Sequence, residues 1–221
     1  TPEQVEHKIR DTVGASRNFY YELPHEFRTR AIPVVQGHTL PQIQTCVNAY
    51  MEMGSSYMGF GSFGTCGANG SVNVLTRKTW GILQQLSDMV TPDRARLHCF
   101  GMGNPPLMYL FQKLNVYSLD SMGWLKVAGY GNIFFPFTRA YNVTYKSLGQ
   151  TDAFVSYEEI ERLKEITGHR CRFFDVPALL TKSRMQRAVH NLAALLDTVE
   201  QLGTLDDTSI LQIMNGRTAY Y

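Results

Sequence analysis

Asp120 is the residue whose type and position point most directly to chemistry. It follows residues 116–119, whose β-branched and apolar side chains predict a short buried strand. Parallel α/β folds place their reactive groups at the carboxyl ends of such strands. The neighbours Tyr117, Leu119 and Trp124 are apolar or aromatic, which argues against a merely solvated charge. Two interpretations stay open: a catalytic carboxylate, or an aspartate that caps the segment after it.

A glycine-rich segment, residues 59–67, is the second candidate site. Its bare backbone amides could approach an anion or a flat ligand closely. The segment lacks the lysine and serine that end a Walker loop, and it matches a dinucleotide fingerprint only in part. Glycines that simply permit sharp turns are the alternative.

Basic residues gather in the C-terminal third of the chain. Between positions 162 and 187 there are seven basic residues and two acidic ones. Such a face could bind a phosphate backbone, although a solvated charged face is the usual explanation. The seven are Arg162, Lys164, Arg170, Arg172, Lys182, Arg184 and Arg187.

The composition is that of a globular protein. Of the 221 residues, 44% are hydrophobic and 18% charged, and the net charge is only +2, so no global basic field indicates nucleic acid. No apolar run approaches the roughly 20 residues that cross a bilayer, and no signal peptide is visible. The cysteines lie far apart, which favours reduced thiols and a cytoplasmic location. They are Cys46, Cys66, Cys99 and Cys171.

Strand and helix patterns alternate from residue 31 to residue 120. This alternation predicts an α/β fold with a parallel sheet, either doubly wound or part of a (β/α) barrel, with its polar strand ends on one face. A further helix is expected at residues 2–13. The predicted strands are 31–37, 56–60, 96–100 and 116–120, and the predicted helices between them are 40–53, 72–89 and 106–114.

Residues 151–221 change character and predict a separate helical region after a domain of residues 1–150. A charged helix is expected at 158–167 and a long one at 179–202. The buried stripe of the long helix is predicted from its apolar spacing. Its members are Val189, Leu192, Leu195, Leu196 and Val199.

Four of these segments, taken together, resemble the tRNA-guanine transglycosylases. They are Pro-Val-Val-Gln-Gly at 33–37, Gly-Phe-Gly-Ser-Phe-Gly at 59–64, Phe-Gly-Met-Gly-Asn-Pro at 100–105 and Tyr-Ser-Leu-Asp-Ser at 117–121. The sequence after Asp120 is more similar to the branch that inserts a 7-deazaguanine into DNA. The resemblance covers about residues 31–195. It implies a (β/α)₈ barrel, of which this chain holds the second half, and an exchange of guanine for a 7-deazaguanine in nucleic acid, with DNA slightly preferred over tRNA.

The resemblance also implies roles for individual residues. Asp120 matches the nucleophile that holds the nucleoside covalently, as a carboxylate does in retaining glycosidases. Gln36 matches the amide that binds the polar edge of the base, and Phe100 the side chain that packs on its flat surface. The backbone positions facing the base are Gly59, Phe60, Gly61 and Gly101. The expected nucleic-acid contacts are Lys126, Arg170, Arg172, Lys182, Arg184 and Arg187.

Two departures from the family bear on the assembly. The half barrel that precedes the glutamine motif in the family is not present, so we expect a longer chain, a partner chain or a homo-oligomer to complete it. The zinc-binding positions read His169, Cys171, Phe174 and His190. Phenylalanine cannot bind zinc, so a four-ligand site would need Asp175 or a distant group.

Two other functions remain open. One is a non-catalytic subunit of the same fold that pairs with an active chain. The other is an unrelated barrel enzyme that binds a sugar phosphate, such as an aldolase or isomerase. That enzyme would need a lysine or glutamate at a strand end and a phosphate loop near the last strands, and the sequence shows neither clearly.

Overall fold

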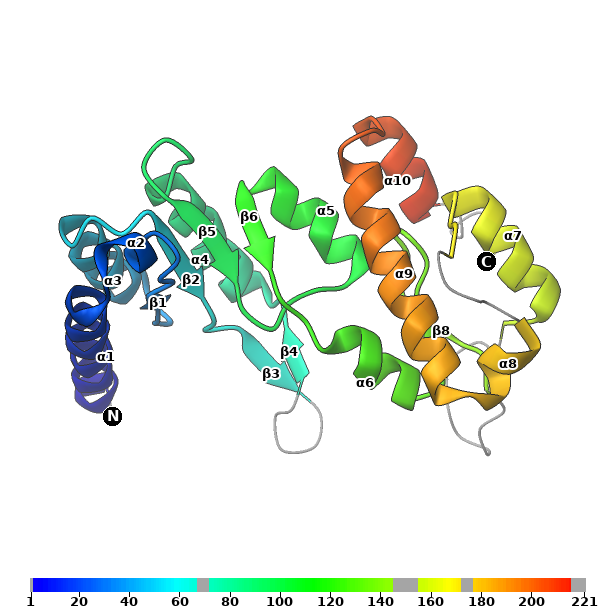
Figure 1. Cartoon of the computed structure of the whole chain (residues 1–221), viewed down its shortest axis with the longest axis horizontal. Helices are drawn as coiled ribbons and strands as arrows, with labels where there is room; N and C mark the ends of the chain where they lie inside the picture. Colours follow the sequence, from blue (N-terminus) through cyan, green and yellow to red (C-terminus); the bar gives the residue numbers. More distant parts are fainter. Residues whose placement is uncertain (1, 67–71, 145–154, 172–176, 216–221) are drawn as a thin grey trace. The chain divides into compact units, whose positions relative to one another are not determined.

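The computed structural model describes residues 2–66, 72–144, 155–171 and 177–215 (Figure 1). Contacts divide the chain into two compact units. Unit 1 comprises residues 1–102 and 111–120, and unit 2 comprises residues 103–110 and 121–221. The domain boundary expected at residue 150 lies outside the described residues, and the contacts divide the chain after Asp120 instead.

Unit 1 is built on a parallel sheet with helices in the strand connections (Figure 1). The helices of this unit are α1 (Pro2–Glu22), α2 (His25–Arg28), α3 (Leu40–Glu52) and α4 (Arg77–Met89). The strands are β1 (Val34–Val35), β2 (Tyr57–Phe60), β3 (Gly64–Cys66), β4 (Val72–Val74), β5 (Arg96–Cys99) and β6 (Val116–Leu119). Helix α5 (Pro105–Lys113) carries the chain from unit 2 back into unit 1.

The four-stranded sheet has the order β1-β2-β5-β6, and every pair is parallel. The strands therefore follow one another in chain order, without the reversal that defines a doubly wound sheet. Barrel strands also follow chain order, so this α/β unit is compatible with part of a (β/α) barrel. The predicted parallel sheet is confirmed.

One face of the sheet forms the core of unit 1. Val35, Met58, Phe60, Leu97 and Cys99 are at most 1% exposed. Successive residues of a strand point to opposite faces, so the residues that alternate with these five along the strands lie on the other face of the sheet. The core face is thus fully apolar, and the opposite face is left for polar chemistry.

The predicted strands and helices of unit 1 are present, although the helix expected at residues 2–13 runs to Glu22 and the strand expected at 31–37 covers only Val34–Val35. Two further predictions need correction. The first turn of the helix predicted at 72–89 is instead strand β4, which pairs antiparallel with β3. Valines at 72 and 74 favour an extended backbone, and α4 begins only after Thr76, whose Oγ1 accepts from Thr79 N at 3.1 Å. The glycine-rich segment thus leads into a hairpin.

Strand β6 is the second correction, because it is not buried. It lies at an edge of the sheet, none of its four residues is buried, and Tyr117 is 59% exposed. The register with β5 shifts between Leu97 and His98, so that Val116 pairs with Leu97 but Ser118 pairs with His98. This bulge gives Tyr117 no partner of its own, and its ring lies 4.3 Å from the Arg96 guanidinium.

The described residues of unit 2 form mainly helices, together with a short antiparallel strand pair. Its strands are β7 (Asn132–Ile133) and β8 (Tyr141–Asn142), and its helices are α6 (Gly123–Gly129), α7 (Tyr157–Thr167), α8 (Pro177–Lys182), α9 (Arg184–Leu202) and α10 (Asp207–Asn215). The single helix predicted at 179–202 is therefore two helices. They separate at Ser183, whose Oγ accepts from Gln186 N at 3.1 Å and caps α9.

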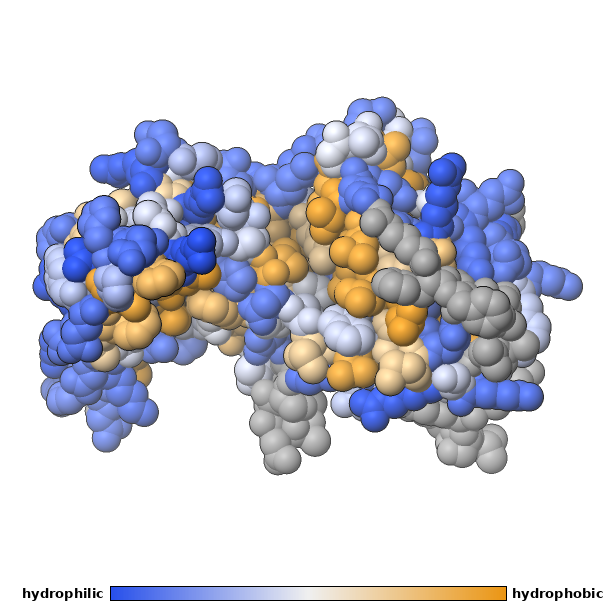
Figure 2. Space-filling model, viewed as in Figure 1, coloured by the Kyte–Doolittle hydropathy of each residue, from blue (hydrophilic) through white to orange (hydrophobic). Residues whose placement is uncertain are grey.

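Helix α9 buries a different face from the predicted one. Of the predicted stripe only Leu195 is buried, whereas Leu196 is 39% and Val199 57% exposed. Figure 2 shows apolar side chains gathered over α9. The buried face consists mainly of alanines and polar residues that are hydrogen-bonded inside unit 2. The polar ones are Arg187, His190, Asn191, Asp197 and Thr198.

Asn191 shows why polar residues can occupy this face. Its Oδ1 accepts from Phe134 N at 2.7 Å. Its Nδ2 donates to the backbone oxygens of Trp124, at 3.0 Å, and Asn132, at 3.2 Å. A buried amide with its hydrogen bonds satisfied can take the place of an apolar residue.

No helix in the described part of the chain is long and apolar enough to cross a membrane.

Candidate active site

Four predicted site residues occupy equivalent positions on the four sheet strands. The paired row Val35, Phe60, Cys99 and Leu119 is the last in the register of the sheet. The next residue on each strand is Gln36, Gly61, Phe100 or Asp120. Because neighbouring strands lie about 4.8 Å apart, these residues line one carboxyl edge. The structure therefore places all four on the same side of unit 1.

Asp120 is held by one of its two carboxylate oxygens. Its Oδ1 accepts from Gly101 N at 3.0 Å and from His98 Nε2 at 3.0 Å. Its side chain is nevertheless 59% exposed. In the described part of the chain no hydrogen bond reaches Oδ2. The carboxylate is thus fixed in orientation while its second oxygen can meet a ligand.

A chain of hydrogen bonds stands behind this carboxylate. His98 Nδ1 lies 2.7 Å from Ser118 Oγ, and Ser118 Oγ in turn bonds Tyr57 Oη. An ionised aspartate can only accept, so His98 Nε2 is the donor to it, and in the neutral form of the ring Nδ1 is then the acceptor. Ser118 then donates to His98, and Tyr57 donates to Ser118. All the donors point towards Asp120.

The bulge in β6 makes this chain possible. Val116 pairs with Leu97, a core residue, whereas Ser118 pairs with His98 on the opposite face. Without the extra residue, Tyr117, strict alternation would put Ser118 on the core side together with Val116. The irregularity therefore turns both Ser118 and Asp120 to the face that carries His98.

Phe100 covers His98 and requires a glycine beside it. The two rings lie 4.5 Å apart, edge to face. A Cβ on Gly59 would come within 2.1 Å of Phe100 Cε2 and 2.9 Å of Ile32 Cγ2. Glycine at 59 is thus what admits the aromatic ring. Phe60, by contrast, is fully buried in the core, so only its backbone can face the site.

Gln36 and Gly101 have definite local roles. Gln36 is half-buried and its Oε1 accepts from Thr12 Oγ1 on α1 at 3.4 Å. Gly101 has a φ of 66°, in the left-handed region, and its oxygen accepts from Asn73 Nδ2 at 3.3 Å. A side chain at 101 would be strained and would meet Asn73. This backbone conformation presents Gly101 N to Asp120.

His98, Ser118 and Tyr57 are site residues that the sequence reasoning missed. A signal was present: in a strand, residues two apart share a face. Once Phe100 is assigned to the ligand side of the strand at 96–100, His98 must lie on that side too. Ser118 carried no such signal, because the bulge cannot be read from the sequence.

The predicted nucleic-acid residues divide into exposed and buried ones. Lys126, Lys182, Arg184 and Arg170 are exposed, and Arg172 lies outside the described residues. Arg187 is buried: its guanidinium donates at 2.8 Å to the backbone oxygens of Ala128 and Leu180. Burial, and then the charge of Arg184, lowers its pKa. Arg187 therefore joins α6 and α8 to α9 and does not face a phosphate backbone.

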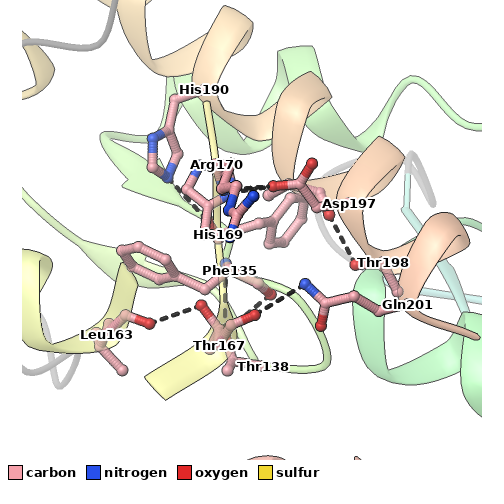
Figure 3. A network of polar contacts seen from close by, with 12 residues as sticks. Phe135, Thr138, Leu163, Thr167, His169, Arg170, His190, Asp197, Thr198 and Gln201 are labelled. Atoms are coloured by element: carbon pink, nitrogen blue, oxygen red, sulfur yellow. Dashed lines mark hydrogen bonds and ion pairs between the residues drawn. The ribbon is translucent and has the colours of Figure 1, made fainter. Parts of the chain in front are cut away.

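The proposed zinc ligands lie in a different environment, inside unit 2 (Figure 3). The His169 and His190 rings are 4.7 Å apart. His169 Nδ1 lies 2.7 Å from Asp197 Oδ2, and His190 Nε2 donates to Phe134 O at 2.9 Å. Both rings thus make hydrogen bonds within unit 2.

Cys171 is partly exposed, and Asp175 lies outside the described residues. Among the described side chains no group of three or more His, Cys, Asp or Glu could hold a metal ion. The described residues therefore do not form a zinc site by themselves, and zinc remains a prediction from the sequence.

The arrangement in unit 1 has the parts of a covalent catalyst: an oriented carboxylate, an aromatic ring and an amide along one edge. A scan of protein-family models and a search of curated proteins find no match to this sequence, so the function has to be inferred from the site.

Proposed function

We propose that this protein is a transglycosylase that exchanges guanine for a 7-deazaguanine base in nucleic acid, with Asp120 as the nucleophile. The observation that carries the proposal is the geometry of Asp120. Two donors hold its Oδ1 at the end of a parallel strand, while the side chain remains 59% exposed next to Phe100. A fixed and accessible carboxylate is what capture of an oxocarbenium-like centre requires.

The reaction proceeds in two displacements at C1′ of the target nucleotide. In the first, an electron pair of Asp120 Oδ2 forms a bond to C1′ as the bond to guanine breaks. The bonding pair leaves with the guanine, which takes a proton from water. In the second, the incoming base loses a proton to water and its nitrogen bonds to C1′. The C1′–Oδ2 bond then breaks and its electron pair restores the carboxylate.

Residues along the same edge suit a planar, polar base. Phe100 offers an aromatic surface, and stacking on a base contributes roughly 1–3 kcal/mol. Gln36 offers an amide that can both donate and accept. Gly61 has no side chain, and Phe60 turns its side chain into the core, so only backbone is presented at this point of the edge. These features support a purine-like ligand over a sugar phosphate.

The nucleic acid and the assembly form part of the proposal. The exposed residues Lys126, Arg170, Lys182 and Arg184 would contact phosphates, with DNA slightly preferred over tRNA as the substrate. The four-stranded sheet would be half of a (β/α)₈ barrel, completed by a longer chain, a partner or self-association. A cytoplasmic enzyme would fit the reduced thiols of Cys46 and Cys99.

Base exchange with radiolabelled guanine tests the proposal. The protein is incubated with labelled guanine and either duplex DNA or tRNA, and label in the nucleic acid is measured. Asp120→Asn should lower incorporation by at least about 10³-fold, because the amide is not a nucleophile. The matched control is Asp88→Asn, an exposed carboxylate on α4 of the same unit, which should exchange like the wild type.

Two outcomes would change the proposal. Full incorporation by Asp120→Asn would remove this residue from the nucleophile role. Incorporation that requires a second protein would favour the partner-completed barrel. If neither nucleic acid is labelled under any of these conditions, the chain does not exchange guanine.

A further inference from the structure

We propose that His98 is a positioning residue that promotes release of the nucleoside from Asp120. This inference rests on the proposed function and assigns the control of its covalent intermediate to the hydrogen-bond chain behind the nucleophile. His98 is 8% exposed and lies under Phe100, so it acts through Asp120 and not on the bases.

The direction of the hydrogen bonds is the first argument. With Asp120 ionised, the protons of Tyr57, Ser118 and His98 all point towards its Oδ1. The Ser118 hydroxyl has a single proton. When it donates this proton in a hydrogen bond to His98 Nδ1, it fixes the His98 tautomer that donates through Nε2. Gly101 N provides a second donor at 3.0 Å. The site therefore stabilises one state of this carboxylate, the charged one.

The change of charge during the reaction is the second argument. Asp120 carries a full negative charge before attack and none in the ester with C1′. Hydrogen bonds to a charged acceptor are stronger than those to a neutral one. His98 therefore stabilises the free enzyme more than the covalent adduct, and it stabilises the negative charge that grows on Oδ1 and Oδ2 as the nucleoside leaves.

The position of His98 excludes the more familiar role of acid for the departing base. Each displacement at C1′ is in line, so both bases occupy the side of the sugar opposite Asp120. His98 Nε2 bonds the nucleophile itself, at 3.0 Å from Oδ1. Its effect must therefore appear in the balance between adduct and free enzyme.

That balance is the quantity to measure. Wild-type protein and variants are mixed with guanine-containing duplex DNA, or tRNA, at one fixed concentration of guanine. The mixture is denatured, and the fraction of protein linked to nucleic acid is measured on a gel and by mass spectrometry. His98→Phe removes the donor and keeps an aromatic ring. It should raise the ratio of adduct to free protein about 10-fold and slow label exchange.

Two further variants make the test specific. His98→Gln keeps a side-chain N–H near the position of Nε2, so the ratio should return towards that of the wild type. Ser118→Ala leaves His98 in place but removes the group that fixes its tautomer, and it should raise the ratio by a smaller factor. Ser118 lies on the edge strand, so this variant also provides a test if His98→Phe does not fold.

The outcomes separate the two proposals. If the wild type forms no adduct and exchanges no guanine, the proposed function itself fails. If the wild type exchanges guanine while the folded variants, His98→Phe or Ser118→Ala, show the wild-type adduct ratio, only the role of His98 is overturned. A ratio raised equally by His98→Phe and His98→Gln would also overturn it, because loss of packing and not loss of the donor would be the cause.

Discussion

The two units each contain a histidine paired with an aspartate, and the pairs differ in what surrounds the carboxylate. In unit 1, His98 is 10% and Asp120 59% exposed at the side chain, with 3.0 Å between them. In unit 2, His169 is fully buried and Asp197 is 7% exposed, with 2.7 Å between them. The same two side chains are thus open to a ligand in one place and enclosed in the other.

The partners of each carboxylate explain this difference. Asp120 sits at a strand end, and its two donors approach a single oxygen. Asp197 sits inside α9, where one oxygen accepts from both His169 and Arg170 N, at 2.7 and 2.8 Å (Figure 3). Phe135 packs edge to face on His169, at 5.8 Å. The enclosed pair joins α9 to the segment after α7, which is a structural role.

Removal of each carboxylate should separate the two roles most clearly. Asp197→Ala takes the acceptor from the buried His169 ring and the partly buried Arg170 N, and we expect it to lower the free energy of unfolding by about 3–5 kcal/mol. Asp120→Ala changes an exposed group, and the expected loss is below about 1 kcal/mol. Urea unfolding followed by circular dichroism measures both.

The reverse order would contradict the comparison. A larger loss for Asp120→Ala than for Asp197→Ala would make the unit 1 pair the structural one. The exchange assay gives the complementary result, since only the Asp120 variant should lose activity while its protein remains folded.

The contrast also shows which parts of the molecule can be read from the sequence. The sequence predicts that Asp120, Phe100 and Gln36 share one sheet edge, because strand ends in a parallel sheet converge, and the structure has them there. The prediction that β6 is buried is wrong, because the order of the strands in the whole sheet decides which strand lies at the edge. The residue types at the strand ends do not indicate His98, because it lies two residues before Phe100, on the face beneath the site.

Helix α9 shows the limit of apolar spacing as a guide. Leu196 and Val199 have the spacing of a buried stripe, yet they are exposed, while His190, Asn191 and Asp197 are buried. A polar residue can be buried only if distant backbone groups satisfy it, as Phe134 satisfies His190. The partners of His190 and Asn191 lie more than fifty positions away in the chain, and those of Asp197 lie 27 and 28 positions away, so a local pattern does not contain them.

The openness of the unit 1 site depends on Gly59, and a methyl group there should test this. Gly59→Ala would place a Cβ 2.1 Å from Phe100 Cε2, so the ring must move off His98. We expect a loss of about 1–3 kcal/mol in unfolding free energy from overpacking and weaker binding of guanine. Thermal unfolding and the guanine dependence of exchange are the measurements.

Gly61→Ala is the matched control for that change. A Cβ at 61 would meet Phe100 Cβ at 3.6 Å, an ordinary contact. This variant should therefore keep its unfolding free energy close to that of the wild type. Equal effects at positions 59 and 61 would show that the close approach of Phe100 to Gly59 is not what matters.

The last prediction concerns the rates at which two cysteines are alkylated, one near each of the two paired histidines. Cys99 follows His98 but points into the core, and burial raises its pKa to about 12. At pH 8 only about one thiol in 10⁴ is then the reactive thiolate. Cys171, two residues after His169, is partly exposed. Iodoacetamide should therefore modify Cys171 well before Cys99, as measured by peptide mass spectrometry.

Prior treatment with a metal chelator extends this measurement to the zinc prediction. A thiol that binds zinc is protected from alkylation, so faster labelling of Cys171 after chelation would place a metal at His169, Cys171 and His190. Cys99 should be unaffected, because its protection comes from burial on the apolar face of the sheet. Rapid labelling of Cys99 in the folded protein would contradict that burial, and with it the assignment of His98 to the opposite, ligand-facing side of β5.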